Sequence, residues 1–229
     1  MVSNARDEIL EKLKKAPKKE VPSRPSMPPY RTLAMDREQL IAEFTRILVE
    51  ETGVVHRVKD YQAALDKLTE VAREEGLKKV MVTTDDVMAR LDLPAWGKKN
   101  NVQVMTPRDF PDRSSYRNAV FDEADAGITG ADFAVAESGT LGLIHNRDQA
   151  RLVSLAPILH VAIVPVDRIV AVYEQVTEKV FGNKVGATGR SPIPSQFVFI
   201  TGPSMTGDIQ GALFKGMHGP RKVIVILVG

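Results

Sequence analysis

The stretch that most constrains the fold of this chain is residues 126–144, AGITGADFAVAESGTLGLI. It sets glycine turns and one carboxylate between short apolar segments, and residues 133–136 and 141–144 are expected to be buried strands. Short apolar runs bounded by glycine turns are typical of parallel strands that are covered on both faces. We therefore expect this stretch at the centre of a sheet, with its polar residues facing a crevice where the strands end.

Glu137 interrupts the apolar run, which makes it the candidate catalytic residue. Its neighbours are the candidate ligand-binding residues, namely Thr129, Gly130, Ser138, Gly139 and Thr140. The alternative is structural, because a glutamate in a tight turn can accept backbone N–H bonds while small residues satisfy their hydrogen bonds locally. Spacing alone leaves both interpretations open.

The rest of the chain alternates short apolar strands with amphipathic helices. Strands are expected at residues 54–58, 80–83, 102–105, 159–164, 197–200 and 223–228. Helices are expected at residues 36–51, with Asp36 as N-cap, at 61–76, 85–91, 116–123 and 148–155, and from an N-cap at Asp167 through Val180. This alternation predicts an α/β fold with a mainly parallel sheet flanked by helices and right-handed crossovers. The glycine- and proline-containing residues 184–195 are expected to form a long functional loop.

Residues 1–35 are expected to form an N-terminal arm before a single α/β domain at residues 36–229. Residues 4–15 have the spacing of a short amphipathic helix, and five prolines follow between positions 17 and 29. Proline- and lysine-rich composition favours an extended linker. The arm is interpreted either as a flexible tail or as a segment that wraps a partner or a neighbouring subunit.

Composition narrows the functional classes. The sequence has 229 residues, a formal net charge of +2 and no cysteine, so thiolate nucleophiles and cysteine-ligated clusters within this chain are excluded. The four histidines are scattered, which predicts no metal site. No run approaches about 18 apolar residues and no basic cluster stands out, so we expect a cytoplasmic protein with no membrane span and no nucleic-acid partner.

A second constellation follows the strand expected at residues 197–200. It supplies the candidate ligand-binding residues Thr201, Gly202, Pro203, Ser204, Thr206 and Asp208. A helix is expected to begin near Asp208, and small hydroxylated residues before a helix are typical of an anion-binding loop. Asp208 is interpreted equally as a ligand contact or as an ordinary carboxylate in the first turn of that helix. His218, before the last strand, is a weaker candidate acid–base residue, with a structural histidine as the alternative.

The segments GITGADFAVAESGTLGLI and ITGPSMTGDI, with GMHGPRKVIVILV at the end, closely resemble the LUD-domain family, in particular its lactate-utilisation protein C group. The resemblance covers residues 36–229. It implies an architecture like that of ribose-5-phosphate isomerase, glucosamine-6-phosphate deaminase and the CoA transferases. Met205 and Gly207 depart from the family, which commonly has arginine and alanine there.

The resemblance further implies a component of bacterial oxidation of L-lactate to pyruvate. Its partners would be two iron–sulfur proteins that carry the clusters, with no cofactor in this chain and a small carboxylate or other anion as ligand. One alternative is a free-standing enzyme of the CoA-transferase or sugar-phosphate isomerase type, with Glu137 as nucleophile or base. Another is a non-catalytic assembly or regulatory subunit. The ligand, the electron acceptor and any homo-oligomer stay open.

Overall fold

The computed structural model describes residues 5–17, 31–181, 196–207 and 213–229. Side chains are described for all of these residues except 178–181. The chain divides into two compact units, residues 1–30 and residues 31–229. The first contains α1 (Ala5–Lys15), which confirms the expected helix. None of the residues of α1 is buried, and Ile9, Leu10 and Leu13 are exposed.

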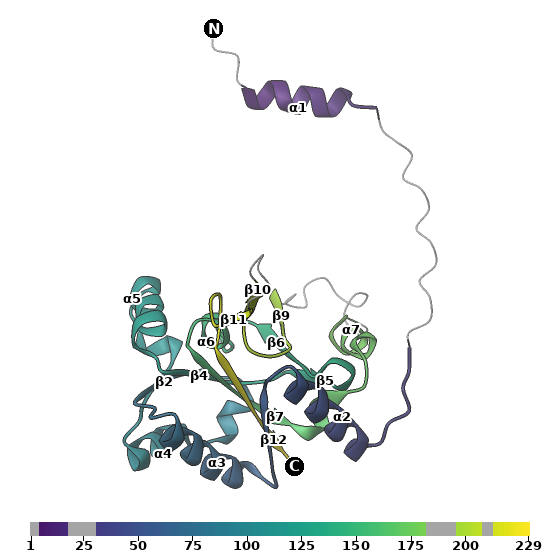
Figure 1. The fold of residues 1–229 in the computed structure, drawn as a ribbon. Coiled ribbons are helices and arrows are strands. Elements are labelled where there is room, and N and C mark those ends of the chain that lie inside the picture. The colour runs from purple at the N-terminus through teal and green to yellow at the C-terminus, as the bar shows by residue number, and fades with distance from the viewer. Residues whose placement is uncertain (1–4, 18–30, 182–195, 208–212) are drawn as a thin grey trace. The chain divides into compact units, whose positions relative to one another are not determined.

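The second unit is built on a six-stranded sheet whose strands are all parallel (Figure 1). In spatial order the strands are β1 (Val54–Val58), β12 (Lys222–Val228), β7 (Leu159–Pro165), β4 (Ala126–Gly130), β2 (Lys79–Val82) and β3 (Gln103–Met105). The predicted α/β class with a mainly parallel sheet is therefore confirmed. No described helix has the length and apolar character needed to cross a bilayer.

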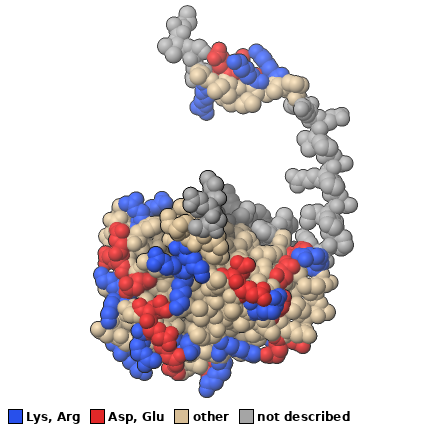
Figure 2. Space-filling model, viewed as in Figure 1, with Lys and Arg blue, Asp and Glu red and all other residues tan. Residues whose placement is uncertain are grey.

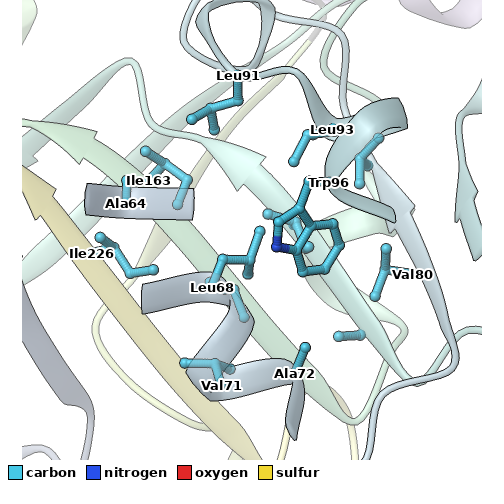
Figure 3. Packing of buried hydrophobic residues seen from close by; sticks show 14 of the residues in the cluster. Ala64, Leu68, Val71, Ala72, Val80, Leu91, Leu93, Trp96, Ile163 and Ile226 are labelled. Atoms are coloured by element: carbon cyan, nitrogen blue, oxygen red, sulfur yellow. The ribbon is translucent and has the colours of Figure 1, made fainter. Parts of the chain in front are cut away.

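One face of this sheet is covered by α3 (Tyr61–Glu74) and α4 (Leu93–Asn100) (Figures 1 and 3). Successive residues of a strand point to opposite faces, so Ile163 of β7 packs under these helices while Val164 packs on the other side. Trp96 lies in this core and donates its indole N–H to Thr69 Oγ1 at 2.9 Å. The buried indole thus has its polar atom satisfied.

Two groups of elements cover the opposite face. Over β2, β3 and β4 lie α5 (Arg113–Asn118), the π-helical η3 (Ala119–Glu123) and α6 (Leu152–Leu155). Over β7 and β12 lie α2 (Arg37–Glu50) and a second sheet. Asp36 caps α2 as predicted, because its carboxylate accepts from Gln39 N while the Gln39 side chain accepts from Asp36 N.

The second sheet has the order β8 (Ile169–Val170), β5 (Phe133–Val135), β6 (Thr140–His145) and β9 (Gln196–Ile200). The expectation that the two apolar halves of residues 133–144 are parallel strands is wrong, because β5 and β6 are antiparallel. The connection between them, η4 (Ala136–Ser138) with Gly139, is far too short for a parallel crossover, which needs a dozen or more residues.

Residues 126–144 were expected to contain glycine turns, but residues 126–130 at their start form β4, one of the two central strands of the large sheet. Gly127 explains this difference: a Cβ built there would lie 1.7 Å from the carbonyl oxygen of Val153, which belongs to α6. A glycine inside a strand often marks such a close approach of backbone to backbone. Its role here is packing rather than turning.

Two other expectations are corrected. Residues 166–168 form the 3₁₀ turn η5 (Val166–Arg168), Ile169–Val170 pair with β5, and the helix α7 (Tyr173–Phe181) begins later than an N-cap at Asp167 requires. β-branched residues favour strand pairing, which explains the strand at 169–170. Within 85–91, only the short η1 (Met88–Arg90) is helical, and a second 3₁₀ turn, η2 (Pro107–Asp109), precedes α5.

The loop after β9 leads into a hairpin, not a helix. The strands β10 (Met205–Gly207) and β11 (Leu213–Lys215) pair in antiparallel fashion. Asp208 lies outside the described residues, as does the loop expected at 184–195. The predicted helix N-terminus therefore has no counterpart in the described part of this segment.

Candidate functional site

Glu137 lies in η4, at the turn between β5 and β6. Its backbone N–H donates to Ala171 O at 3.0 Å, and its carboxylate accepts from Tyr173 N at 3.0 Å. Gly139 closes the turn with φ of +59°, and a Cβ there would lie 2.6 Å from Leu48 N in α2. Both the left-handed conformation and the close contact require glycine. The turn is thus held in place by α2 on one side and α7 on the other.

Arg31, at the start of the second unit, contacts two glutamates. Its Nη2 lies 3.1 Å from the Glu137 carboxylate, and its Nε lies 2.6 Å from Glu174 Oε1. The hydrogen bond with Glu174, followed by the charge of Glu137, raises the pKa of Arg31 above its ordinary value, and Arg31 in turn lowers the pKa of Glu174. Two carboxylates against one guanidinium leave this group net negative. Glu137, Glu174 and Arg31 are together called the Glu137 group.

Four hydroxyls form a cluster beside Glu137. Thr140 Oγ1 lies 2.8 Å from both Ser138 Oγ and the Tyr173 hydroxyl, and 2.9 Å from Thr201 Oγ1. Ser138 also donates to the Tyr173 hydroxyl at 3.0 Å. The structure therefore joins Thr201 of the second constellation to the turn of the first. Tyr173 lies within the helix expected through Val180, and nothing in its local sequence indicated this contact.

Thr129 and Gly130 lie away from that cluster, in β4. Thr129 Oγ1 is 2.9 Å from Nε2 of His160, whose complete burial lowers its pKa to about 4 and so keeps the imidazole neutral. Gly130 N donates to Asp85 Oδ2 at 3.2 Å, and Gly130 O accepts from Gln149 Nε2 at 2.8 Å. These two predicted ligand-binding residues thus serve contacts within the protein.

Asp132 and Arg168 follow the carboxyl ends of β4 and β7, and sequence reasoning missed both. Burial raises the pKa of Asp132 to about 6, although Ile144 N donates to its carboxylate at 2.7 Å. Arg168 Nη1 donates to Ala131 O at 2.9 Å, and its Nη2 pairs with Asp86. The order in which strands are added to the sheet reverses between β2 and β4: β3 follows on the outer side of β2, whereas β7 follows on the other side of β4. Such a switch point is where α/β folds commonly bind ligands. Polar residues directly after apolar strands were the signal that could have found them.

Of the remaining predicted residues, Ser204 and His218 contact each other at a third site. Ser204 Oγ accepts from His218 N at 3.3 Å, and Ser204 N donates to Pro220 O at 2.8 Å. His218 borders a pocket of about 460 Å³ with Arg151 and Arg221. Thr206 pairs with β11, Pro203 is buried, and Gly202 has φ of +150°. Thr201 and Ser204, expected in one loop site, therefore contact different groups.

Metal binding has no support in the described residues, where no group of three or more His, Asp or Glu side chains could hold an ion. On the face shown in Figure 2, basic and acidic side chains are interspersed. The geometry thus offers a glutamate held by hydrogen bonds, a hydroxyl cluster beside it, and a separate arginine-bordered pocket.

Sequence comparison matches the LUD domain to residues 41–228. The chain belongs to the LUD-domain family. Among the relatives of this LUD-domain protein is lactate utilization protein C of Shouchella clausii, 31% identical over 81% of this chain and 79% of the relative. Lactate utilization protein C of Deinococcus radiodurans is 31% identical over 90% of this chain and 89% of the relative.

A solved structure has the same fold. It is the crystal structure of a DUF162-family protein from Deinococcus radiodurans. The superposition covers 85% of this LUD-domain chain and 99% of the Deinococcus chain, with a TM-score of 0.60 and 22% sequence identity. Its likeness bears on the α/β architecture alone.

Proposed function

We propose that this LUD-domain protein is a cytoplasmic component of a bacterial system that oxidises L-lactate to pyruvate together with iron–sulfur partner proteins. The observation that carries the proposal is the similarity, over most of both chains, to relatives named lactate utilization protein C. That similarity supports a role in lactate utilisation. Because this sequence has no cysteine, the clusters of the proposed system belong to the partner chains.

Within this proposal Glu137 is the base and Arg31 is the anchor for the substrate's carboxylate. Arg31 is 60% exposed in its side chain, whereas Glu137 is 20% exposed and fixed by the N–H of Tyr173. A guanidinium can exchange one carboxylate for another because its planar donors bind them in the same bidentate manner. A substrate held at Arg31 would then lie beside Glu137, which has to come within about 2.6 to 3.2 Å of the proton that it takes.

The test is L-lactate-dependent dye reduction in extracts of a strain that lacks only this chain. The strain is complemented with wild type, Glu137→Gln or Glu174→Gln, each expressed to the same level. Both substitutions remove a carboxylate that pairs with Arg31, but only Glu137 also accepts from Tyr173. Glutamine at position 137 keeps an acceptor for that N–H, so the turn is expected to stay folded.

We expect wild type to restore dye reduction, Glu174→Gln to restore most of it, and Glu137→Gln to lose at least about a hundredfold, the usual contribution of a general base. Equal losses in both variants would mean that the two glutamates only hold Arg31. Full restoration by Glu137→Gln would remove the base from the proposal. If wild type itself restores nothing, the lactate assignment is wrong.

A further inference from the structure

The pocket that His218 borders has features that the proposed chemistry does not use. It lies between η3, α6 and the turn that precedes β12, and its volume is about 460 Å³. It is called the arginine pocket, and its principal side chains are Phe121, Arg151, Ile158, Met217, His218 and Arg221. Ile158 and Arg221 directly precede β7 and β12, so the pocket lies at the amino-terminal edge of the parallel sheet. The strand-end residues Asp132 and Arg168 follow the opposite ends of strands of that sheet.

Large apolar side chains surround this pocket without being buried by the protein. Phe121 is 58% exposed, Ile158 66% and Met217 64%. Single exposed apolar residues are ordinary, but several around one concave surface mark an interaction site. Leu213 and Phe214 of the neighbouring β11 are also exposed, which extends the apolar character beyond the pocket itself.

The charged side chains of the arginine pocket have one sign. They are Arg151 and Arg221, and no acidic side chain is among the described residues that line the pocket. Arg151 donates to Gln196 Oε1 at 2.9 Å, which orients the guanidinium without neutralising it. Protein interfaces differ from the rest of a protein surface in that they are rich in aromatic residues, methionine and arginine and poor in lysine and acidic residues.

These charges also select the kind of occupant. A two-fold contact would pair this surface with the same surface of a second copy, which offers the arginines basic partners and no carboxylate from the described lining residues. Like charges in such a contact are unfavourable, whereas an occupant with carboxylates would complement both guanidinia. The exposed apolar side chains of the pocket would be buried by apolar side chains on the same segment of the partner.

We propose that the arginine pocket is the docking surface for a partner protein, which inserts a segment carrying apolar side chains flanked by carboxylates. That the partner is an iron–sulfur protein of the lactate system rests on the proposed function. Docking here leaves the Glu137 group outside the interface residues, so binding of the partner and the role of Glu137 can be separated by mutation.

The experiment purifies the tagged full-length chain from the source bacterium grown on L-lactate and measures the co-purifying iron–sulfur protein by mass spectrometry and iron content. The partner is then purified, and its affinity for each variant is measured at two salt concentrations. The charge variant is Arg151→Glu with Arg221→Glu, and the apolar variant is Phe121→Ser with Ile158→Ser. The matched control is Val49→Ser with Arg73→Glu, which changes one exposed apolar residue of α2 and one exposed arginine of α3.

We expect both pocket variants to bind the partner at least tenfold more weakly, and the control to bind it as wild type does. The wild-type affinity should fall as salt rises, because salt screens the attraction between the arginines and the partner's carboxylates. In the charge variant the dependence should reverse, because its glutamates repel those carboxylates and salt screens the repulsion. All variants are checked for wild-type thermal unfolding. At equal expression, the pocket variants should also restore less lactate-dependent dye reduction than the control.

Wild-type affinity in both pocket variants would overturn the docking proposal while leaving the proposed function intact. If light scattering instead shows a homodimer that the pocket variants dissociate, the occupant is a second copy and the proposal is again wrong. Failure of the wild-type chain to restore dye reduction is a separate result, because it overturns the proposed function.

Discussion

The ionisation of Asp132 is expected to weaken the folded state at neutral pH. Burial raises the pKa of this carboxyl from its ordinary value of 3.8 to about 6, and the charges of Asp85 and Asp86 act in the same direction. Below pH 3.8 the group is protonated in both the folded and the unfolded state, so it costs nothing. Above pH 6 it is ionised in both, and the folded state bears a cost of about 3 kcal/mol. The free energy of unfolding is therefore expected to fall by this amount as pH rises from 3.8 to 6, because Asp132 ionises later in the folded state than in the unfolded state.

The substitution Asp132→Asn removes this charge and keeps an oxygen that accepts from Ile144 N, which now donates at 2.7 Å. At about pH 8 the variant should have a free energy of unfolding larger than that of wild type by up to about 3 kcal/mol. Well below pH 3.8 the two proteins should be equally stable. Urea unfolding followed by fluorescence of the single, buried Trp96 measures both free energies across the pH range.

Asp112→Asn is the matched control, because its pKa shift has the opposite sign. The carboxylate of Asp112 accepts from the backbone N–H groups of Ser115 and Ser114 at the start of α5, which lowers its pKa. Its substitution should therefore lower stability at neutral pH and have less effect in acid. A difference between Asp132→Asn and wild type that is the same at every pH would refute the burial argument.

Two further predictions concern packing and acid stability. Gly127→Ala should lower the free energy of unfolding by about 1 to 3 kcal/mol or prevent folding, since its Cβ would lie 1.7 Å from Val153 O. Gly207→Ala, whose Cβ would meet no atom of the described residues nearer than 3.8 Å, should change the thermal midpoint little. Similar midpoints for the two variants would contradict this. His160 titrates near 6.5 when unfolded but has a pKa of about 4 when folded, so wild type should lose stability as pH falls from 6.5 to 4. His160→Gln can still hydrogen-bond to Thr129 and should lose less over that window in urea unfolding; an equal loss would show that other groups cause it.

Local sequence was sufficient for most elements of the large sheet. The alternation of strand and helix predicted the parallel α/β class, and the capping box at Asp36 and Gln39 set the start of α2. These features depend on neighbours a few residues away, so a single sequence contains them. Gly127 was misinterpreted because a glycine needed for close packing looks the same as a glycine needed for a turn.

The candidate site was only partly accessible to such reasoning. Glu137, Ser138 and Thr140 are close together in the chain, and the structure adds Thr201, which follows β9, as well as Tyr173 from α7. The expected single anion pocket is distributed over separate places, because Ser204 turns towards His218. Helix or strand periodicity contains no information on which of two nearby hydroxyls faces which neighbour.

The sequence by itself determined the layered α/β architecture, the family and the short turn that carries Glu137, since each follows from patterns within a few tens of residues. Only the tertiary structure decided that Arg31 pairs with Glu137 and Glu174, which are 106 and 143 positions away. It also decided that burial, and not neighbouring sequence, raises the pKa of Asp132. Ion pairs and desolvation depend on distance in space, and long-range packing sets that distance.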